Sequence, residues 1–263
     1  MIRNFQMHIY PVRNSLWKWN CDEVLRRASL FTGKRIVAIA TDAKTDSAWE
    51  VKEYLKDFTD TFIEVTNDPK QREVLTFIPM LEMIESLEGV TFCCHSKGVR
   101  DQQPADRNQA IRLWTQAMYD TCLDYWPIVE SILTQKAMAG SFRRFGQFRT
   151  PGNNRWHYSG TFYWFRNRDV FLGNWRHVDE GFYGTESWPG LMFTEEQTGC
   201  IFLDDAKDMY DIKYWNTITP ALNQWKAAHK HNLTNYEELA ANRTADFPLT
   251  VSLGPSHVPI QKP

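Results

Sequence analysis

Three short segments of the sequence bring together residue types that can bind an anion or move a proton. The first, His95-Ser96-Lys97-Gly98, directly follows an apolar run at residues 90–94. A lysine charge beside a glycine, at the carboxyl end of a strand, suits a phosphate group, and His95 can donate a second hydrogen bond. Arg100 adds a third positive group nearby. A solvated turn that carries one lysine is the plainer interpretation of so short a motif.

The second segment is an aromatic run at residues 156–164, in a chain that contains 11 Trp, 10 Tyr and 16 Phe. Aromatic rings build cores, and they also line sites where a sugar or a base stacks. Gly160 within a strand-like pattern indicates that another group approaches the backbone closely. Trp164 is expected in the core, whereas His157 and Ser159, close to the glycine, are harder to explain as core residues.

The third segment, residues 184–190, begins and ends with glycine and is expected to form a loop. It carries Glu186 and Trp188. A carboxylate held in a loop against a ring can act as a general base, and an indole that excludes water would raise its pKa. A helix N-cap or an exposed acid is an equally good interpretation of Glu186.

Two further polar stretches allow a functional and an ordinary interpretation. Residues 140–152 are basic and contain glycine, so they could clamp an anionic substrate, although a mobile solvated loop is the default. Asp204 and Asp205 could hold Mg²⁺ or Mn²⁺, although an exposed turn explains them as well.

The elements that position these residues alternate between strand and helix. Strands are predicted at residues 7–12, 35–41, 61–66 and 90–94, and helices at residues 21–31, 48–57 and 69–87. Ser47 and Glu50 match a capping box at the start of the second helix. This alternation is typical of an α/β layer with a mostly parallel central sheet flanked by helices. Because ligands bind at the carboxyl ends of such strands, the polar residues that follow them are expected to share one crevice.

Composition restricts the class of protein. The 263 residues include 43% hydrophobic and 24% charged residues and carry a net charge of −2, which excludes a mainly disordered chain and argues against nucleic acid as a partner. Five cysteines without a CxxC spacing favour a reducing compartment. Since no apolar leader or spanning segment is evident, a cytoplasmic location is expected. We expect a main domain at residues 1–214 and a C-terminal extension at 215–263.

In this order, the segments resemble those of glycosyltransferases of the GT-A type, and in particular a group with a His-x-Lys-Gly signature after the fourth strand. The resemblance spans residues 7–205. The matching motifs are His8-Ile9-Tyr10-Pro11, His95-Ser96-Lys97-Gly98, Trp114, the segment HYSGTFYW at 157–164, and Glu186-Ser187-Trp188.

The resemblance implies a GT-A-like, Rossmann-like fold that binds a nucleotide-diphosphate-sugar donor across the first half of the sheet. It implies donor-binding roles for Tyr10, Pro11, Arg13, Asp42, Asn67, Arg100, His157, Ser159 and Gly160. GT-A enzymes usually carry Asp-x-Asp where this chain has residues 95–97. Lys97 and His95 would therefore neutralise the leaving diphosphate, so no cofactor is required, although Mn²⁺ or Mg²⁺ could serve. Glu186 would deprotonate the acceptor hydroxyl, and Trp188 would stack on the acceptor sugar.

The expected function is therefore sugar transfer from a nucleotide-diphosphate sugar to a hydroxyl of a glycan, a step of glycan biosynthesis. A non-catalytic glycan-binding module would use the aromatic residues without the lysine. Another nucleotide-dependent group transferase, moving a phosphoryl or sulfuryl group, is the remaining alternative. Such enzymes usually carry the phosphate-binding motif GxxxxGK[ST], which is absent here.

Overall fold

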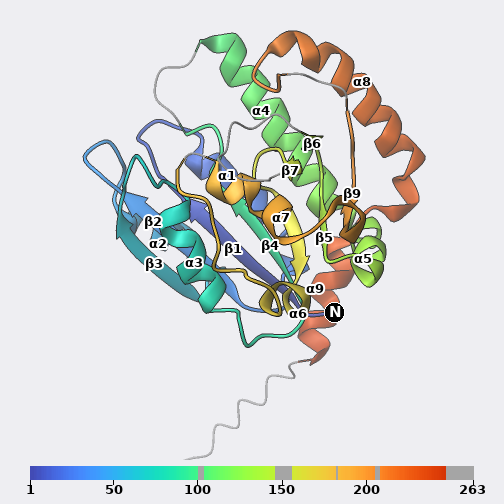
Figure 1. Cartoon of the computed structure of the whole chain (residues 1–263), viewed down its shortest axis with the longest axis horizontal. Helices are drawn as coiled ribbons and strands as arrows, with labels where there is room; N and C mark the ends of the chain where they lie inside the picture. The colour runs from blue at the N-terminus through green and yellow to red at the C-terminus, as the bar shows by residue number, and fades with distance from the viewer. Residues whose placement is uncertain (100–103, 146–155, 182, 205–207, 247–263) are drawn as a thin grey trace, which may run out of the picture.

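The protein is described here by a computed structural model, which covers residues 1–99, 104–145, 156–181, 183–204 and 208–246 (Figure 1). Its centre is a seven-stranded sheet in the order β3-β2-β1-β4-β8-β5-β9, and β6 and β7 form a separate two-stranded sheet. The strands are β1 (Arg3–Ile9), β2 (Arg35–Thr41), β3 (Thr61–Thr66), β4 (Val90–His95), β5 (Met138–Gly140), β6 (Arg143–Phe145), β7 (Trp156–Tyr158), β8 (Tyr163–Arg166) and β9 (Thr198–Cys200).

The helices flank this sheet, which confirms the predicted α/β class (Figure 1). The α-helices are α1 (Trp17–Leu25), α2 (Ala48–Leu55), α3 (Val74–Glu82), α4 (Ala105–Tyr119), α5 (Trp126–Gln135), α6 (Asn167–Phe171), α7 (Gly184–Met192), α8 (Ile212–Ala228) and α9 (Tyr236–Asp246). Short turns of helix are η1 (Ala28–Leu30), η2 (Asp120–Asp124), η3 (Glu195–Gln197) and η4 (Lys230–Asn232). None of the helices in the described ranges is long and apolar enough to cross a membrane.

The four strands β1 to β4 are parallel to one another, as predicted, and form one half of the sheet. Alternate residues of β2 belong to two different cores: Val37 packs in one core with α1 and α2, and Ile36 packs in the other with α3. This alternation follows from the two-residue period of a strand and places helices on both faces. Beyond β4, strand β8 runs antiparallel to both β4 and β5.

Several boundaries differ from the sequence prediction for physical reasons. The first strand spans Arg3–Ile9 rather than residues 7–12, because its first polar residues are buried and bonded; the amide of Asn4, for example, donates to Val90 O at 3.3 Å. The predicted helix 21–31 begins at Trp17 and ends at Leu25. The helix predicted at 69–87 is shortened to α3, with Pro79 inside it. The predicted capping box is present: the Ser47 side chain accepts from the Glu50 amide at 3.2 Å.

The loop predicted at residues 184–190 is wrong, because this segment forms helix α7. Proline inside a helix leaves the carbonyl four residues earlier without its donor. Here Pro189 would leave the carbonyl of Thr185 unpaired, but the hydroxyl of Tyr163 donates to it at 3.2 Å.

The prediction of a loop at 140–152 is also wrong in part, because Arg143–Phe145 forms β6 and the side chain of Arg144 is buried against Asp204. Residues 146–152 lie outside the described ranges.

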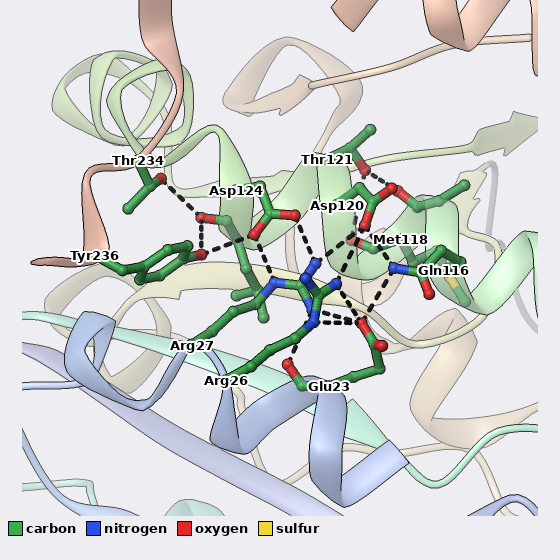
Figure 2. A network of polar contacts seen from close by, with 12 residues as sticks. Glu23, Arg26, Arg27, Gln116, Met118, Asp120, Thr121, Asp124, Thr234 and Tyr236 are labelled. Carbon is green, nitrogen blue, oxygen red and sulfur yellow. Dashed lines mark hydrogen bonds and ion pairs between the residues drawn. The ribbon is translucent and has the colours of Figure 1, made fainter. Parts of the chain in front are cut away.

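The C-terminal helices pack on the same structure as the sheet. Trp215, Ile218 and Leu222 of α8 belong to the hydrophobic core that also contains β1 and β4. An ionic network joins these helices to α1 and η2: Lys226 of α8 pairs with Asp120, and the hydroxyl of Tyr236 on α9 donates to Asp124 at 2.9 Å. Figure 2 shows the part of this network around Arg27. Its centre is the fully buried guanidinium of Arg27, which bonds to Asp124 at 2.6 Å.

Candidate active site

A cavity of about 390 Å³ lies where the four parallel strands end. Its lining residues are His8, Tyr10, Asp42, Lys44, Asn67, Pro69, Arg72, Glu73, His95, Ser96, Lys97, Gly98, Val99, Ile111, Thr161, Glu186 and Tyr210. The carboxyl ends of β1, β2, β3 and β4 all contribute, as expected for a ligand site in a parallel sheet. The structure thus brings together six of the residues that the sequence analysis selected: Tyr10, Asp42, Asn67, His95, Lys97 and Glu186.

One side of the cavity is organised around the carboxylate of Asp42, directly after β2. Oδ2 of Asp42 accepts hydrogen bonds from the Tyr10 hydroxyl at 2.6 Å and from the Asn67 amide at 2.8 Å, and Oδ1 accepts from the Lys44 backbone amide. Burial tends to raise the pKa of Asp42, but these hydrogen bonds, led by that of Tyr10, lower it overall. Asp42 therefore stays ionised and holds the side chains of Tyr10 and Asn67 in place.

Lys97 lies on the opposite side, in the turn that follows β4. Gly98 has a φ of +82°, a left-handed conformation that favours glycine, and the Asn20 amide donates to the Lys97 carbonyl at 2.9 Å. The ammonium lies 3.7 Å from the centre of the Trp114 ring. Within the described residues, no carboxylate forms an ion pair with it. The positive charge at the cavity is therefore available to an anionic ligand.

Glu186 enters the cavity from the first turn of α7. Its Oε1 accepts the backbone N–H of Gly160 at 2.5 Å. Burial raises the pKa of Glu186, while the positive charge of Lys97 and the bond from Gly160 oppose that shift in part. The pKa of Glu186 is thus higher than usual, as predicted. The cause is burial of the carboxyl in the cavity wall and not shielding by the Trp188 ring. A carboxyl of this kind suits a general base.

Gly160 is required by the packing around it. Its φ is +102°, and a Cβ at this position would lie 2.6 Å from the sulfur of Met118. The next residue, Thr161, also has a positive φ and lines the cavity. The predicted close approach at Gly160 is therefore confirmed.

Several residues at the cavity were assigned no role from the sequence. His8 and Glu73 come from β1 and from the residue before α3, and Tyr210 comes from the segment that leads into α8. Burial lowers the pKa of His8 to about 4, although the nearby Glu73 opposes this shift. No local pattern marks Glu73, since one acidic residue in a polar stretch is indistinguishable from a solvated one.

The role predicted for Trp188 is wrong. Its side chain is 0% exposed, its ring packs edge-on against Phe77 with centroids 5.0 Å apart, and its indole N–H donates to Trp175 O at 3.0 Å. Helix α7 turns Glu186 to the cavity and Trp188 into the core, because residues two apart on a helix point in different directions. An acceptor sugar therefore has no access to this ring.

Other predicted donor-binding residues do not line the cavity. His157 and Ser159 are buried in and beside β7, where burial and then Arg144 lower the pKa of His157 to about 3. Pro11 is buried, and the exposed Arg13 donates to Ala43 O at 3.1 Å. Arg100 lies outside the described residues.

The side chains at the cavity do not favour a divalent cation bound by protein ligands alone. Among the described residues, no group of three or more His, Cys, Asp or Glu is arranged to hold a metal ion. Asp204 is paired with Arg144 at 2.8 Å, and Asp205 lies outside the described ranges. The ligands that Mg²⁺ prefers are oxygens, whereas residues 95 and 97 supply nitrogen. The expectation that no cofactor is required, although Mn²⁺ or Mg²⁺ could serve, therefore stays a prediction, and we derive no step through a metal ion.

Comparisons with known proteins find similarity only at the level of structure. No family model matches the sequence, and no curated protein matches it. Residues 1–349 of Staphylococcus aureus TarS, in complex with UDP-GlcNAc, align over 96% of this chain and 77% of that one, with 10% identity and a TM-score of 0.40. The same fragment without ligand gives 9% identity over 96% and 76%, with a TM-score of 0.41.

A second protein, from Desulfovibrio desulfuricans G20, was assigned as a nucleotide-diphospho-sugar transferase. It aligns over 87% of this chain and 97% of its own, with 12% identity and a TM-score of 0.37. At such low identities and TM-scores, these similarities do not establish a function.

Proposed function

We propose that this chain is a glycosyltransferase that moves a sugar from a nucleotide-diphosphate-sugar donor to a hydroxyl group of a glycan acceptor. One observation carries the proposal: the Lys97 ammonium, which has no carboxylate partner among the described residues, and the Glu186 carboxyl line the same cavity at the carboxyl ends of four parallel strands. A cation for the leaving group and a base for the attacking group are the two parts that sugar transfer requires.

The donor would lie across the carboxyl ends of the strands. The nucleoside fits the side where Asp42 organises Tyr10 and Asn67. The diphosphate fits the side of Lys97, with the ring of His95 beside it and Arg72 on the lining of the same cavity. This orientation puts the sugar toward Glu186.

The reaction breaks the bond between the anomeric carbon of the sugar and the diphosphate oxygen. Lys97 and His95 stabilise the negative charge that develops on that oxygen. Glu186 takes the proton of the acceptor hydroxyl as the hydroxyl oxygen bonds to the anomeric carbon, and the nucleoside diphosphate leaves with the bonding electrons. The raised pKa of Glu186 brings its basicity closer to that needed at neutral pH.

The alternative of a glycan-binding module has lost much of its support. That interpretation uses the aromatic residues, and Trp188, the ring expected to stack on a sugar, is buried. A phosphoryl or sulfuryl transferase would also use an anion site and a base, so the products of the reaction must separate it from sugar transfer.

The test combines ligand binding with turnover. We expect thermal-shift and calorimetric panels of nucleoside diphosphates, with and without Mn²⁺ or Mg²⁺, to show binding of at least one of them. Lys97→Ala should lower sugar transfer by about 10²- to 10³-fold. Lys56→Ala, which removes an exposed lysine directly after α2, is the matched control and should leave transfer unchanged. Binding of an oligosaccharide with no binding of any nucleoside diphosphate would contradict the proposal.

A further inference from the structure

Glu73 connects the two segments that carry the proposed chemistry. It lies directly before α3, and its carboxylate faces the cavity. One oxygen pairs with Nδ1 of His95, at the end of β4. The other accepts the hydroxyl of Thr185 at 2.9 Å, and Thr185 is the residue before Glu186 on α7. The side chain of Glu73 therefore bonds both to His95, on the diphosphate side of the cavity, and to Thr185, next to the proposed base Glu186.

This connection depends on a close approach of α7 to α3. A Cβ at Gly184 would lie 2.5 Å from a methyl group of Val74, the first residue of α3, and 2.1 Å from the carbonyl oxygen of Asp179. Only glycine therefore lets the N-terminus of α7 come near enough for Thr185 to reach Glu73. Gly184, which suggested a loop in the sequence, instead permits the close contact between α7 and α3.

The bond to Glu73 determines which nitrogen of His95 is left for a ligand. A carboxylate bonded to one imidazole nitrogen orients the ring and favours a proton on that nitrogen. Here that nitrogen is Nδ1. The other nitrogen, Nε2, is buried and has no hydrogen-bond partner among the described residues. A buried polar atom of this kind is costly unless a ligand completes its bonding.

The charges around His95 support the same assignment. Glu73, His8 on β1 and Glu186 on α7 interact with it electrostatically, and Lys97, on its own turn, lines the same cavity. His8 bonds through Nδ1 to the Thr76 hydroxyl at 2.7 Å and is held neutral by burial. Burial would raise the pKa of Glu73, but His95 lowers it to about 2, so Glu73 stays a carboxylate.

From this geometry we infer that Glu73 is a positioning residue: it accepts the Nδ1–H of His95 and holds the ring so that, in the complex with the donor, Nε2–H donates to the diphosphate. The inference rests on the proposed function, because it assigns the ligand of Nε2. It adds a residue that acts through His95 and that need not touch the sugar.

Two-dimensional ¹H–¹⁵N NMR of the histidine rings tests this arrangement without any assay of activity. His95→Gln identifies the signals of His95. In the wild type with a bound nucleoside diphosphate, we expect protons on both ring nitrogens, one donated to Glu73 and the other to the ligand. In Glu73→Gln, the ring should lose one of the two protons. A His95 spectrum that is unchanged in Glu73→Gln would overturn the inference.

Thr185→Val is the matched control, since it removes the other bond to Glu73 and keeps the pair with His95. It should retain the wild-type His95 spectrum, and a loss of the same proton in this variant would also overturn the inference. Should Glu73→Gln fail to fold, the His95 spectra of the wild type and of Glu73→Asp test the inference instead. Both should show the doubly protonated ring, and a wild-type ring with a single proton contradicts the assignment.

Calorimetry links the pair to the ligand. Glu73→Gln and His95→Gln should each weaken binding of the nucleoside diphosphate by about ten- to hundredfold. The double variant should bind as weakly as His95→Gln alone, because Glu73 acts through His95. If the losses of binding free energy in the two single variants add up in the double variant, Glu73 does not act through His95. If the wild type binds no nucleoside diphosphate, the proposed function fails, whereas NMR of the unliganded wild type and of Glu73→Gln still decides whether Glu73 accepts the hydrogen bond of His95 Nδ1.

Discussion

The ammonium of Lys97 lies 3.7 Å from the centre of the indole ring of Trp114. Trp114 is buried on α4, and its ring also meets Tyr210 edge-on, with centroids 5.4 Å apart. The negative face of the indole attracts the ammonium without neutralising it, as a carboxylate would. The ring therefore positions the cation at the cavity and leaves its full charge for a ligand.

Trp114→Leu should weaken binding of the nucleoside diphosphate by about two- to thirtyfold, because a cation–π contact contributes about 0.5–2 kcal/mol. Trp114→Phe is the matched variant, since it keeps an aromatic face. The indole N–H that it removes has no hydrogen-bond partner among the described residues, so its loss should cost little. Calorimetry with both variants checks this. Equal weakening in the two would show that volume, rather than the ring face, determines the position of Lys97.

The pH profile of sugar transfer should show an acid limb that belongs to Glu186. The pKa of this carboxyl is raised, first by burial, so the group is protonated over a wider acid range than an exposed glutamate. Only the carboxylate accepts a proton, and activity should therefore rise with pH as Glu186 ionises.

Glu186→Gln should lower kcat by about 10²- to 10⁴-fold and flatten that limb, while binding of the nucleoside diphosphate changes little. Steady-state rates across pH and calorimetry provide the two measurements. A variant that loses donor binding in proportion to its rate would assign Glu186 a structural role.

Gly160→Ala should reduce the free energy of unfolding more than Gly181→Ala does. Both glycines have a positive φ, at +102° and +95°, so alanine is strained at either position by about 1 kcal/mol. At Gly160 the new methyl would also meet the sulfur of Met118 at 2.6 Å, whereas nothing lies within 4 Å at Gly181. We expect a further cost of about 1–3 kcal/mol at Gly160 from overpacking. Urea unfolding of the two variants measures the difference, and equal costs would refute the packing argument.

Arg27→Met should lower the free energy of unfolding by about 3–5 kcal/mol, because it removes the buried partner of three carboxylates, of which Asp124 has no other ion pair among the described residues. The guanidinium of Arg27 is fully buried and pairs with Glu23, Asp120 and Asp124, so that it joins α1 to η2 (Figure 2). Lys56→Met removes an exposed pair with Glu53 and should cost less than about 1 kcal/mol. Chemical denaturation of both variants checks the contrast. A small effect of Arg27→Met would mean that water reaches the carboxylates.

The same network predicts a loss of stability in acid. Burial raises the pKa of Glu23, but its bonds to Arg27 and Arg26 outweigh this and lower it below the ordinary value. A carboxyl whose pKa is lowered by folding stabilises the protein above its unfolded pKa, and this contribution disappears as the pH falls through the folded pKa. The midpoint of thermal unfolding should therefore fall in acid, and by less in a Glu23→Gln variant. An equal fall in both would assign the acid sensitivity to other groups.

Local sequence patterns were sufficient for three of the four strands that hold the cavity, whereas β1 spans Arg3–Ile9 instead of the predicted residues 7–12. Strands β2 and β3 lie at the predicted residues, because their apolar runs are bounded by turn residues. The capping box at Ser47 also formed, since its bonds join groups only three residues apart. Parallel strands end at a common edge, so Asp42, Asn67 and Lys97 could be assigned to one cavity before the structure was known.

Contacts between distant segments determined the rest. Glu73 acquires its importance from His95 and Thr185, residues separated from it by 22 and 112 positions, and no local pattern encodes such a pairing. Helix α7 was mistaken for a loop because its proline is compensated by the Tyr163 hydroxyl, a residue of β8. The burial of Trp188 also depends on distant contacts. The orientation of a helix is determined by which of its faces the neighbouring elements cover, and that is known only once the chain has packed.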